Sequence, residues 1–144
     1  MTATVSAALA AFALMISAPA FAEAPATATT ITLNFDTDAP TGKVMVALYD
    51  SEAAYSDGSP VAHAMVDVAA GEHAAIFTDL PAGDYAAKTF HDVDGDGKMK
   101  TNPFGMPTEP YAFSNNARGN MGPARWDAAH FVADGAVEQT SERR

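Results

Sequence analysis

The sequence contains no cysteine, and this absence excludes several kinds of chemistry. Without thiols the protein has no disulfide bonds, no cysteine nucleophile and no cysteine-ligated zinc. Its four histidines are scattered and lack H-E-x-x-H spacing, so a zinc site is not expected. The fold must therefore be held by its apolar core, together with any metal ion that it binds.

Positive charge is scarce. Eight Lys and Arg residues stand against 18 Asp and Glu residues, which gives a formal net charge of −10. Because such a surface repels phosphate backbones, nucleic acid is not expected as a partner. Cations, basic protein surfaces and neutral or polar small molecules remain open, and acidity alone also keeps an exported protein soluble.

Long apolar runs are missing too, apart from one near the start. That run, from Ala7 to Ile16, is shorter than the roughly 20 residues that span a bilayer. Small residues at Ala20 and Ala22 then form an A-x-A cleavage pattern, although the preceding segment carries no Lys or Arg. We predict a signal peptide over residues 1–22, with an uncleaved anchor as the alternative. A periplasmic or secreted protein without an integral membrane segment follows.

The rest of the chain alternates apolar and polar residues in short stretches separated by Gly, Pro and Asp turns, which indicates strands. After an unstructured lead-in at 23–29, the seven expected strands cover residues 30–36, 43–50, 61–69, 73–78, 85–91, 128–133 and 136–140. In the fourth strand Ile76 is expected to point inward. Asp134-Gly135 predicts a hairpin between the last two strands. Residues 141–144 are expected to form a tail.

This pattern predicts an all-β domain over residues 30–140: a seven-stranded prealbumin-like or Ig-like β-sandwich, with a closed barrel as the alternative. After the signal peptide, no stretch shows a convincing helical period over 11 residues. The segment 92–127 is too long for a passive connection, so we expect it to serve a function. Its aromatic residues favour an ordered segment anchored to the sandwich.

The long segment opens with an Asp-rich loop. Asp92, Asp94 and Asp96 match the first half of the D-x-[DN]-x-[DN]-G calcium loop, in which alternate carboxylates converge at a tight turn. The backbone carbonyl of Lys98 is expected to add a ligand. Hard oxygen ligands of this kind suit calcium.

The match is incomplete because Pro103 occupies the twelfth position, where a full calcium loop has a bidentate Glu. Glu109 is the nearest downstream carboxylate, and it reaches the loop only if the chain folds back. We therefore expect weak calcium binding. The alternative is a plain turn in which the Asp side chains accept hydrogen bonds from nearby backbone amides.

Polar side chains recur further along the segment. Glu109, Tyr111, Asn115, Asn116 and Arg118 are the candidate surface for a small polar ligand or a protein partner. The alternative is that these groups satisfy the backbone of their own segment.

Several short runs together resemble a known family. They are Leu80-Pro-Ala-Gly-Asp-Tyr85, His91-Asp92 with the Asp/Gly loop, Phe104-Gly-Met-Pro-Thr-Glu109 and Tyr111-Ala-Phe-Ser-Asn-Asn-Ala-Arg-Gly119. In this order the chain resembles domain-of-unknown-function family 2141, small exported bacterial proteins. The resemblance covers roughly residues 30–140. It implies a prealbumin-like sandwich and implies no reaction.

Three functions compete at this stage. The leading prediction is a non-catalytic exported module, not an enzyme, in which a structural calcium ion orders a ligand- or partner-binding segment. The second is a carboxylate-based hydrolase acting on a neutral or polar substrate, for which His91, Asp92 and Glu109 are the only plausible acid–base set. The third is an adhesion or assembly module that uses an exposed sheet edge.

Overall fold

A computed structural model describes residues 27–142, so the predicted signal peptide lies outside the described residues. The strands are β1 (Thr29–Asp36), β2 (Lys43–Tyr49), β3 (Ala62–Asp67), β4 (Ala74–Leu80), β5 (Gly83–Asp92), β6 (Tyr111–Phe113), β7 (Phe131–Ala133) and β8 (Ala136–Glu142). The helical elements are α1 (Glu52–Asp57), α2 (Trp126–Ala129) and the 3-10 turns η1 (Val68–Ala70) and η2 (Ser114–Asn116). Within 27–142, no helix is long and apolar enough to cross a membrane.

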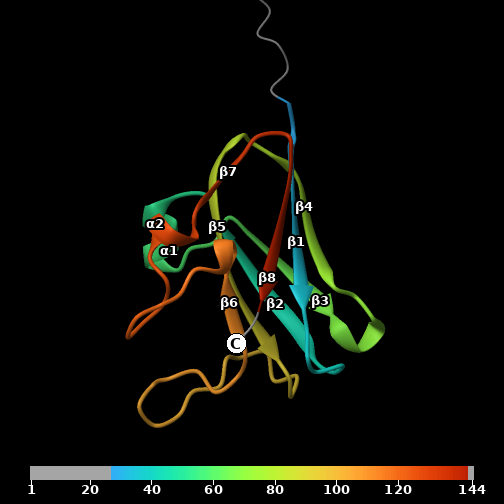
Figure 1. The fold of residues 1–144 in the computed structure, drawn as a ribbon, viewed down its shortest axis with the longest axis vertical. Coiled ribbons are helices and arrows are strands. Elements are labelled where there is room, and N and C mark those ends of the chain that lie inside the picture. Colours follow the sequence, from blue (N-terminus) through green and yellow to red (C-terminus); the bar gives the residue numbers. More distant parts are fainter. Residues whose placement is uncertain (1–26, 143–144) are drawn as a thin grey trace, which may run out of the picture.

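The strands form two sheets (Figure 1). The smaller sheet has the order β4-β1-β8, in which β8 runs parallel to β1 and β4 runs antiparallel to it. The larger sheet has the order β3-β2-β5-β6, and β7 pairs with the first part of β5. The domain is therefore mostly β, as the sequence predicted.

Alternation along the strands builds one core between the two sheets. In β1, Ile31, Leu33 and Phe35 are buried, and in β2, Val44, Val46 and Leu48 are buried. These side chains belong to one apolar cluster to which both sheets contribute. Burial of a side chain of this size stabilises the fold by about 1.5–3 kcal/mol. The opposite face of the larger sheet is thereby left to meet the loops.

Residues 27–142 contain eight strands instead of the predicted seven. β6 lies inside the long segment 92–127, where no strand was predicted because three residues are too few to show an alternating pattern. The expected strand at 128–133 is divided into the helix α2 and the short strand β7. β1 begins at Thr29 and β8 continues to Glu142, so the first and last strands in chain order each extend beyond their predicted bounds.

The predicted hairpin at Asp134-Gly135 is wrong. β7 pairs with β5 in one sheet and β8 pairs with β1 in the other, so the turn carries the chain between the sheets. The predicted inward position of Ile76 is also wrong: its side chain is 62% exposed, while Ala75 and Phe77 on either side are buried.

Within residues 27–142 the two α-helices have six and four residues, so neither is long enough to show a helical period over 11 residues. α1 begins at Ser51, whose Oγ accepts a hydrogen bond from the Ala54 amide at 3.3 Å, and ends at Gly58 in the left-handed conformation. Its buried residue, Tyr55, packs edge-on against Trp126 with ring centroids 5.8 Å apart. α1 and α2 thus lie together on one side of the molecule (Figure 1).

Candidate functional site

The outer face of the larger sheet carries two rows of side chains that cross its strands. Strand register places Met65, Met45, Phe90 and Tyr111 in one row, from β3 through β2 and β5 to β6. The same register places His63, Ala47, Lys88 and Phe113 in the next row. Directly opposed residues on one face lie close enough for their side chains to touch. Most side chains in these two rows are apolar.

A cavity of about 980 Å³ lies over these rows. Two segments of the chain form its walls, one at 99–107 and the other at 119–123. Both segments lie on the outer side of the larger sheet (Figure 1). Four methionines line the cavity: Met45, Met99, Met106 and Met121. We call this cavity the apolar groove.

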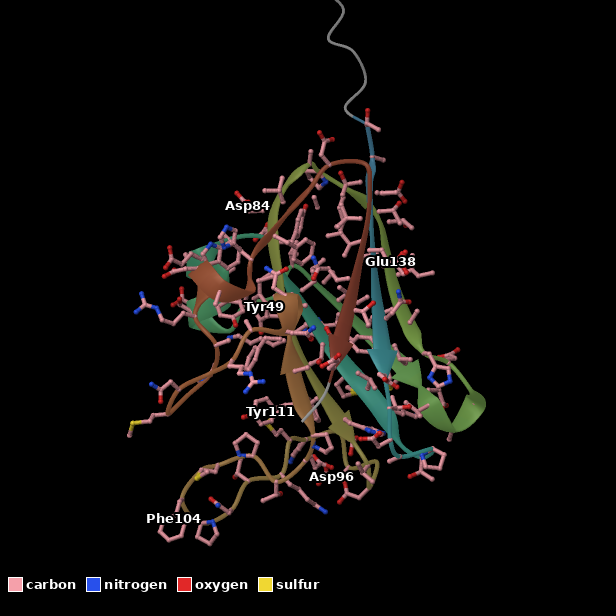
Figure 2. The ribbon with its side chains drawn as sticks, in the orientation of Figure 1. Tyr49, Asp84, Asp96, Phe104, Tyr111 and Glu138 are labelled. Atoms are coloured by element: carbon pink, nitrogen blue, oxygen red, sulfur yellow. The ribbon has the colours of Figure 1, made fainter. Side chains whose placement is uncertain are left out.

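The first wall is a small hairpin that is stabilised by its own hydrogen bonds. Thr101 and Pro107 form an antiparallel bridge, and the Asn102 Oδ1 accepts hydrogen bonds from the amides of Phe104 at 2.9 Å and Met106 at 3.0 Å. Phe104 is 88% exposed at the tip, where its ring points away from the sheets (Figure 2). The hairpin tip therefore presents an apolar ring to water.

The second wall is closely folded at Gly119. A Cβ added to this residue would lie 1.8 Å from the Gly122 carbonyl oxygen, so only glycine fits here. Met121 adopts a φ of 58° and is fully exposed. The wall is therefore a tight loop that presents an apolar side chain to water.

Lys88 provides positive charge on the groove floor. Its Nζ lies 4.0 Å from the centroid of the Tyr55 ring and 4.9 Å from that of Tyr49, and it donates a hydrogen bond to the Tyr55 carbonyl oxygen at 2.6 Å. Burial lowers the pKa of Lys88 from its ordinary value. Across residues 27–142 it forms no ion pair with a carboxylate, and the groove lining contains no Asp or Glu.

The Asp-rich loop follows β5 and lies at the same end of the molecule as the hairpin wall (Figure 2). Asp92 is buried, and its carboxylate accepts hydrogen bonds from the amides of Gly95 at 2.8 Å, Asp96 at 3.1 Å and Gly97 at 2.8 Å. One carboxylate oxygen from each of Asp92, Asp94 and Asp96 lies within 4.8 Å of the other two. The predicted convergence of three carboxylates is therefore present.

A lysine of the same chain already lies beside this cluster of carboxylates. Lys100 forms an ion pair with Asp94, and this partner lowers the pKa of the Asp94 carboxyl and raises that of the Lys100 ammonium. The amide of Lys98 donates a hydrogen bond to the Asp96 Oδ1 at 2.8 Å, as a plain Asp turn would also show. Both the cation-binding and the plain-turn interpretations of the loop account for these contacts.

Glu109 connects the Asp-rich loop to the hairpin wall. The chain does fold back, and Glu109 is buried, with its carboxylate accepting hydrogen bonds from the amides of Val93 and Lys100, each at 3.1 Å. Glu109 thus fixes both ends of the segment between the loop and the hairpin.

The residues of the predicted ligand surface do not lie together in the structure. Tyr111 lines the groove, whereas Asn115 and Asn116 lie beside β8. The Asn115 Nδ2 donates to the His130 carbonyl at 2.5 Å, and the Asn116 Oδ1 accepts from the Glu142 amide at 2.9 Å. Both asparagines adopt positive φ and support the backbone, and exposed Arg118 lies outside the groove lining.

The residues considered for a hydrolase do not converge on one point. His91 is buried, with its Nε2 2.6 Å from the Thr41 carbonyl oxygen, to which it donates. His91 and Asp92 are consecutive in β5, so their side chains leave opposite faces of the sheet. The carboxylates of Asp92 and Glu109 are occupied by backbone amides, as described above.

Reasoning from the sequence missed the groove floor. Alternation along β2 places Met45, Ala47 and Tyr49 on the face opposite the core residues Val44, Val46 and Leu48. It could not indicate that Lys88 and Phe90 of β5 continue the same rows, because pairing between distant strands leaves no local signal.

The fold and site define a class: a small two-sheet β-domain with an apolar groove on an outer sheet face. The chain belongs to the family described as uncharacterized protein conserved in bacteria (DUF2141), whose model matches residues 35–141. This match confirms the resemblance drawn from the sequence. No curated protein and no solved structure matches the chain, so the prealbumin-like subtype stays a prediction.

Proposed function

We propose that this protein is an exported, non-catalytic binding module that holds an apolar small molecule in the groove on the outer face of its larger sheet. The observation that carries the proposal is the groove itself. Its volume of about 980 Å³ is within the range of small-molecule sites, and its floor and walls are mainly apolar. A solvent-facing sheet surface normally carries polar residues instead.

Of the four sheet edges in residues 27–142, β3 and β4 form two, and the other two are poor sites for the assembly alternative. The outer edge of β8 is partly covered by η2, since the Asn115 amide donates to the Gln139 Oε1 at 3.2 Å. The free edge of the larger sheet beside β5 is divided between β6 and β7, which have only three residues each. Short or covered edges are poor templates for an added strand.

A neutral fluorescent probe such as N-phenyl-1-naphthylamine tests the groove directly. We expect its fluorescence to rise on binding and to saturate at one probe per chain. Ala47 lies in the middle of the floor, so Ala47→Leu, which fills part of the groove, should weaken probe binding about tenfold, as expected for a clash of roughly 1.4 kcal/mol.

Ile76→Ser is the matched control, because Ile76 is an exposed apolar residue of β4 in the other sheet. This variant should bind the probe as the wild type does. Equal loss of binding in both variants, or non-saturating fluorescence, would show adsorption to exposed apolar surface and would refute the groove.

We further propose that a calcium ion occupies the Asp-rich loop and holds the hairpin wall in place. The three convergent carboxylates support this, and Glu109 couples the loop to the hairpin. Calcium would be held by Asp92, Asp94, Asp96 and the carbonyl of Lys98. With no carboxylate at Pro103, the expected dissociation constant is about 10⁻⁴–10⁻³ M, the range of extracellular modules.

Thermal melting with and without 10 mM calcium tests this second proposal, with 10 mM magnesium as the control. Calcium should raise the melting temperature, because it binds the folded state alone. Because Lys100 competes for Asp94, Lys100→Gln should strengthen calcium binding severalfold. An unchanged melting temperature in both proteins would identify the loop as a plain Asp turn.

A further inference from the structure

The positive charge on the floor of the groove specifies its ligand more closely. Within residues 27–142, the acidic residues stay out of the groove lining, whose ionisable groups besides tyrosine are Lys88 and His63. In a protein with a net charge of −10, a cavity lined by a lysine and by no carboxylate favours an anionic ligand over a cationic one. Lys88 also borders a second, smaller cavity of about 330 Å³, whose lining includes Glu52 and Asp127. An apolar molecule alone would leave the Lys88 ammonium without an anionic partner.

Lys88 is also held in position to receive a ligand. The faces of Tyr49 and Tyr55 fix the ammonium by cation–π contacts, and the Tyr55 carbonyl accepts one of its three N–H groups. Two N–H groups therefore remain for a ligand. Since the side chain is already half-buried and held by both rings, it loses little rotational freedom on binding.

The groove has a polar end and an apolar end. Lys88 lies beside Tyr49 at one end, with its Nζ 4.9 Å from the centroid of the ring. Figure 2 shows Tyr111 and then Phe104 further from Tyr49, towards the hairpin tip, and the methionines belong to the lining of the groove. Methionine side chains adapt their shape to flexible apolar ligands. The arrangement fits a molecule with a compact negative head and an elongated apolar body.

On the basis of the proposed groove function, we propose that the natural ligand is a medium- or long-chain carboxylate. Its head group accepts hydrogen bonds from the Lys88 ammonium, and its alkyl chain lies along the Met45–Phe90 row towards the hairpin wall. Charge complementarity at one end and apolar complementarity along the rest select this ligand over a neutral lipid or an amine.

Displacement of N-phenyl-1-naphthylamine by three ligands of equal chain length tests the proposal: decanoate, 1-decanol and decyltrimethylammonium. We expect decanoate to bind about tenfold more tightly than 1-decanol, since a charge-assisted hydrogen bond contributes on that scale. Decyltrimethylammonium should bind least tightly of the three.

Three variants assign the preference to Lys88. Lys88→Gln keeps a donor for the Tyr55 carbonyl and removes the charge, so it should bind decanoate and 1-decanol equally. Lys88→Arg should keep the preference. Lys43→Gln removes one positive charge from β2 outside the groove lining and should bind like the wild type.

Equal affinities for decanoate and 1-decanol in the wild-type protein, or a preference that persists in Lys88→Gln, would overturn the carboxylate proposal and leave the groove itself standing. Failure of the neutral probe to bind would instead refute the proposed groove function. Melting temperatures of all variants separate a lost preference from a lost fold, and Lys88→Arg provides the test if Lys88→Gln does not fold.

Discussion

At the scale of single residues, Ser114 joins three elements through one hydroxyl group. It is fully buried, its Oγ accepts a hydrogen bond from the Ala87 amide at 2.8 Å, and it donates to the Ala129 carbonyl at 2.5 Å. Ser114→Ala would leave both backbone groups buried and unpaired, at about 1–3 kcal/mol each. We expect the free energy of unfolding in urea to fall by about 2–4 kcal/mol. A loss below 0.5 kcal/mol would mean that water replaces the hydroxyl.

Tyr55 makes stability depend on alkaline pH. Burial, with a smaller contribution from the negative charge of Tyr49, raises the pKa of Tyr55 from its ordinary value of 10.0 to about 12. The phenol therefore ionises first in the unfolded chain, so its stabilising effect is complete below pH 10.0 and is lost as the pH rises towards about 12. Allowing for solvent screening, we expect a loss of about 1 kcal/mol in this window.

Unfolding in urea at several pH values from 9 to 12 measures this loss, and Tyr55→Phe is the control. The variant loses the hydrogen bond from the Tyr55 hydroxyl to the Ala124 carbonyl, at 2.8 Å, so its stability is lower at neutral pH. Its stability should fall less steeply above pH 10. Parallel pH profiles for the two proteins would assign the alkaline loss to other groups.

At the scale of elements, the loop at 119–123 can be disturbed without touching the sheets. In Gly119→Ala the added Cβ meets the Gly122 carbonyl oxygen, so this wall of the groove must move. Because the neighbouring atom belongs to the backbone and cannot simply rotate away, we expect a loss of about 1–3 kcal/mol in stability together with a severalfold loss of probe binding. Gly122→Ala, where the added Cβ meets nothing within 4 Å, is the matched control. Equal binding by both variants would exclude this loop from the site.

The strands and helices also show which features local sequence patterns can predict. Alternation correctly identified β1, β2 and β5 and the core residues Ile31 and Leu33, because a strand with one buried face shows its period directly. α1 has only six residues and one buried side chain, which is too short for a helical period, although the cap at Ser51 and the glycine at Gly58 do mark its ends. Ile76 was misplaced because β4 has a short apolar stretch in which either phase of the alternation looks apolar.

At the scale of the whole molecule, the two candidate sites are the Asp-rich loop and the groove. They differ in how far apart in the sequence their residues lie. The loop is a contiguous motif, so its three convergent carboxylates were predictable from spacing alone. The groove floor requires the register of four strands that are far apart in sequence, and its walls are loops whose paths depend on tertiary contacts. Long-range register of this kind has no signature in a single sequence.

The contacts of Glu109 predict that the two sites are coupled. Its carboxylate joins Val93 of the Asp-rich loop to Lys100 at the base of the hairpin wall, so a cation that orders the loop also orders the wall. Any such coupling is reciprocal: calcium should strengthen probe binding by the same factor by which the probe strengthens calcium binding. We expect a factor of about 3–10, measured by titrating N-phenyl-1-naphthylamine at zero and 10 mM calcium.

Glu109→Gln tests whether the coupling runs through this side chain. The amide keeps one acceptor oxygen in place of two, so one of the two backbone bonds is lost while both sites keep their own residues. Each ligand should still bind alone, and the coupling factor should approach one. If calcium changes probe affinity equally in the wild type and in Glu109→Gln, the link between loop and groove lies elsewhere. If calcium changes it in neither protein, the two sites act independently.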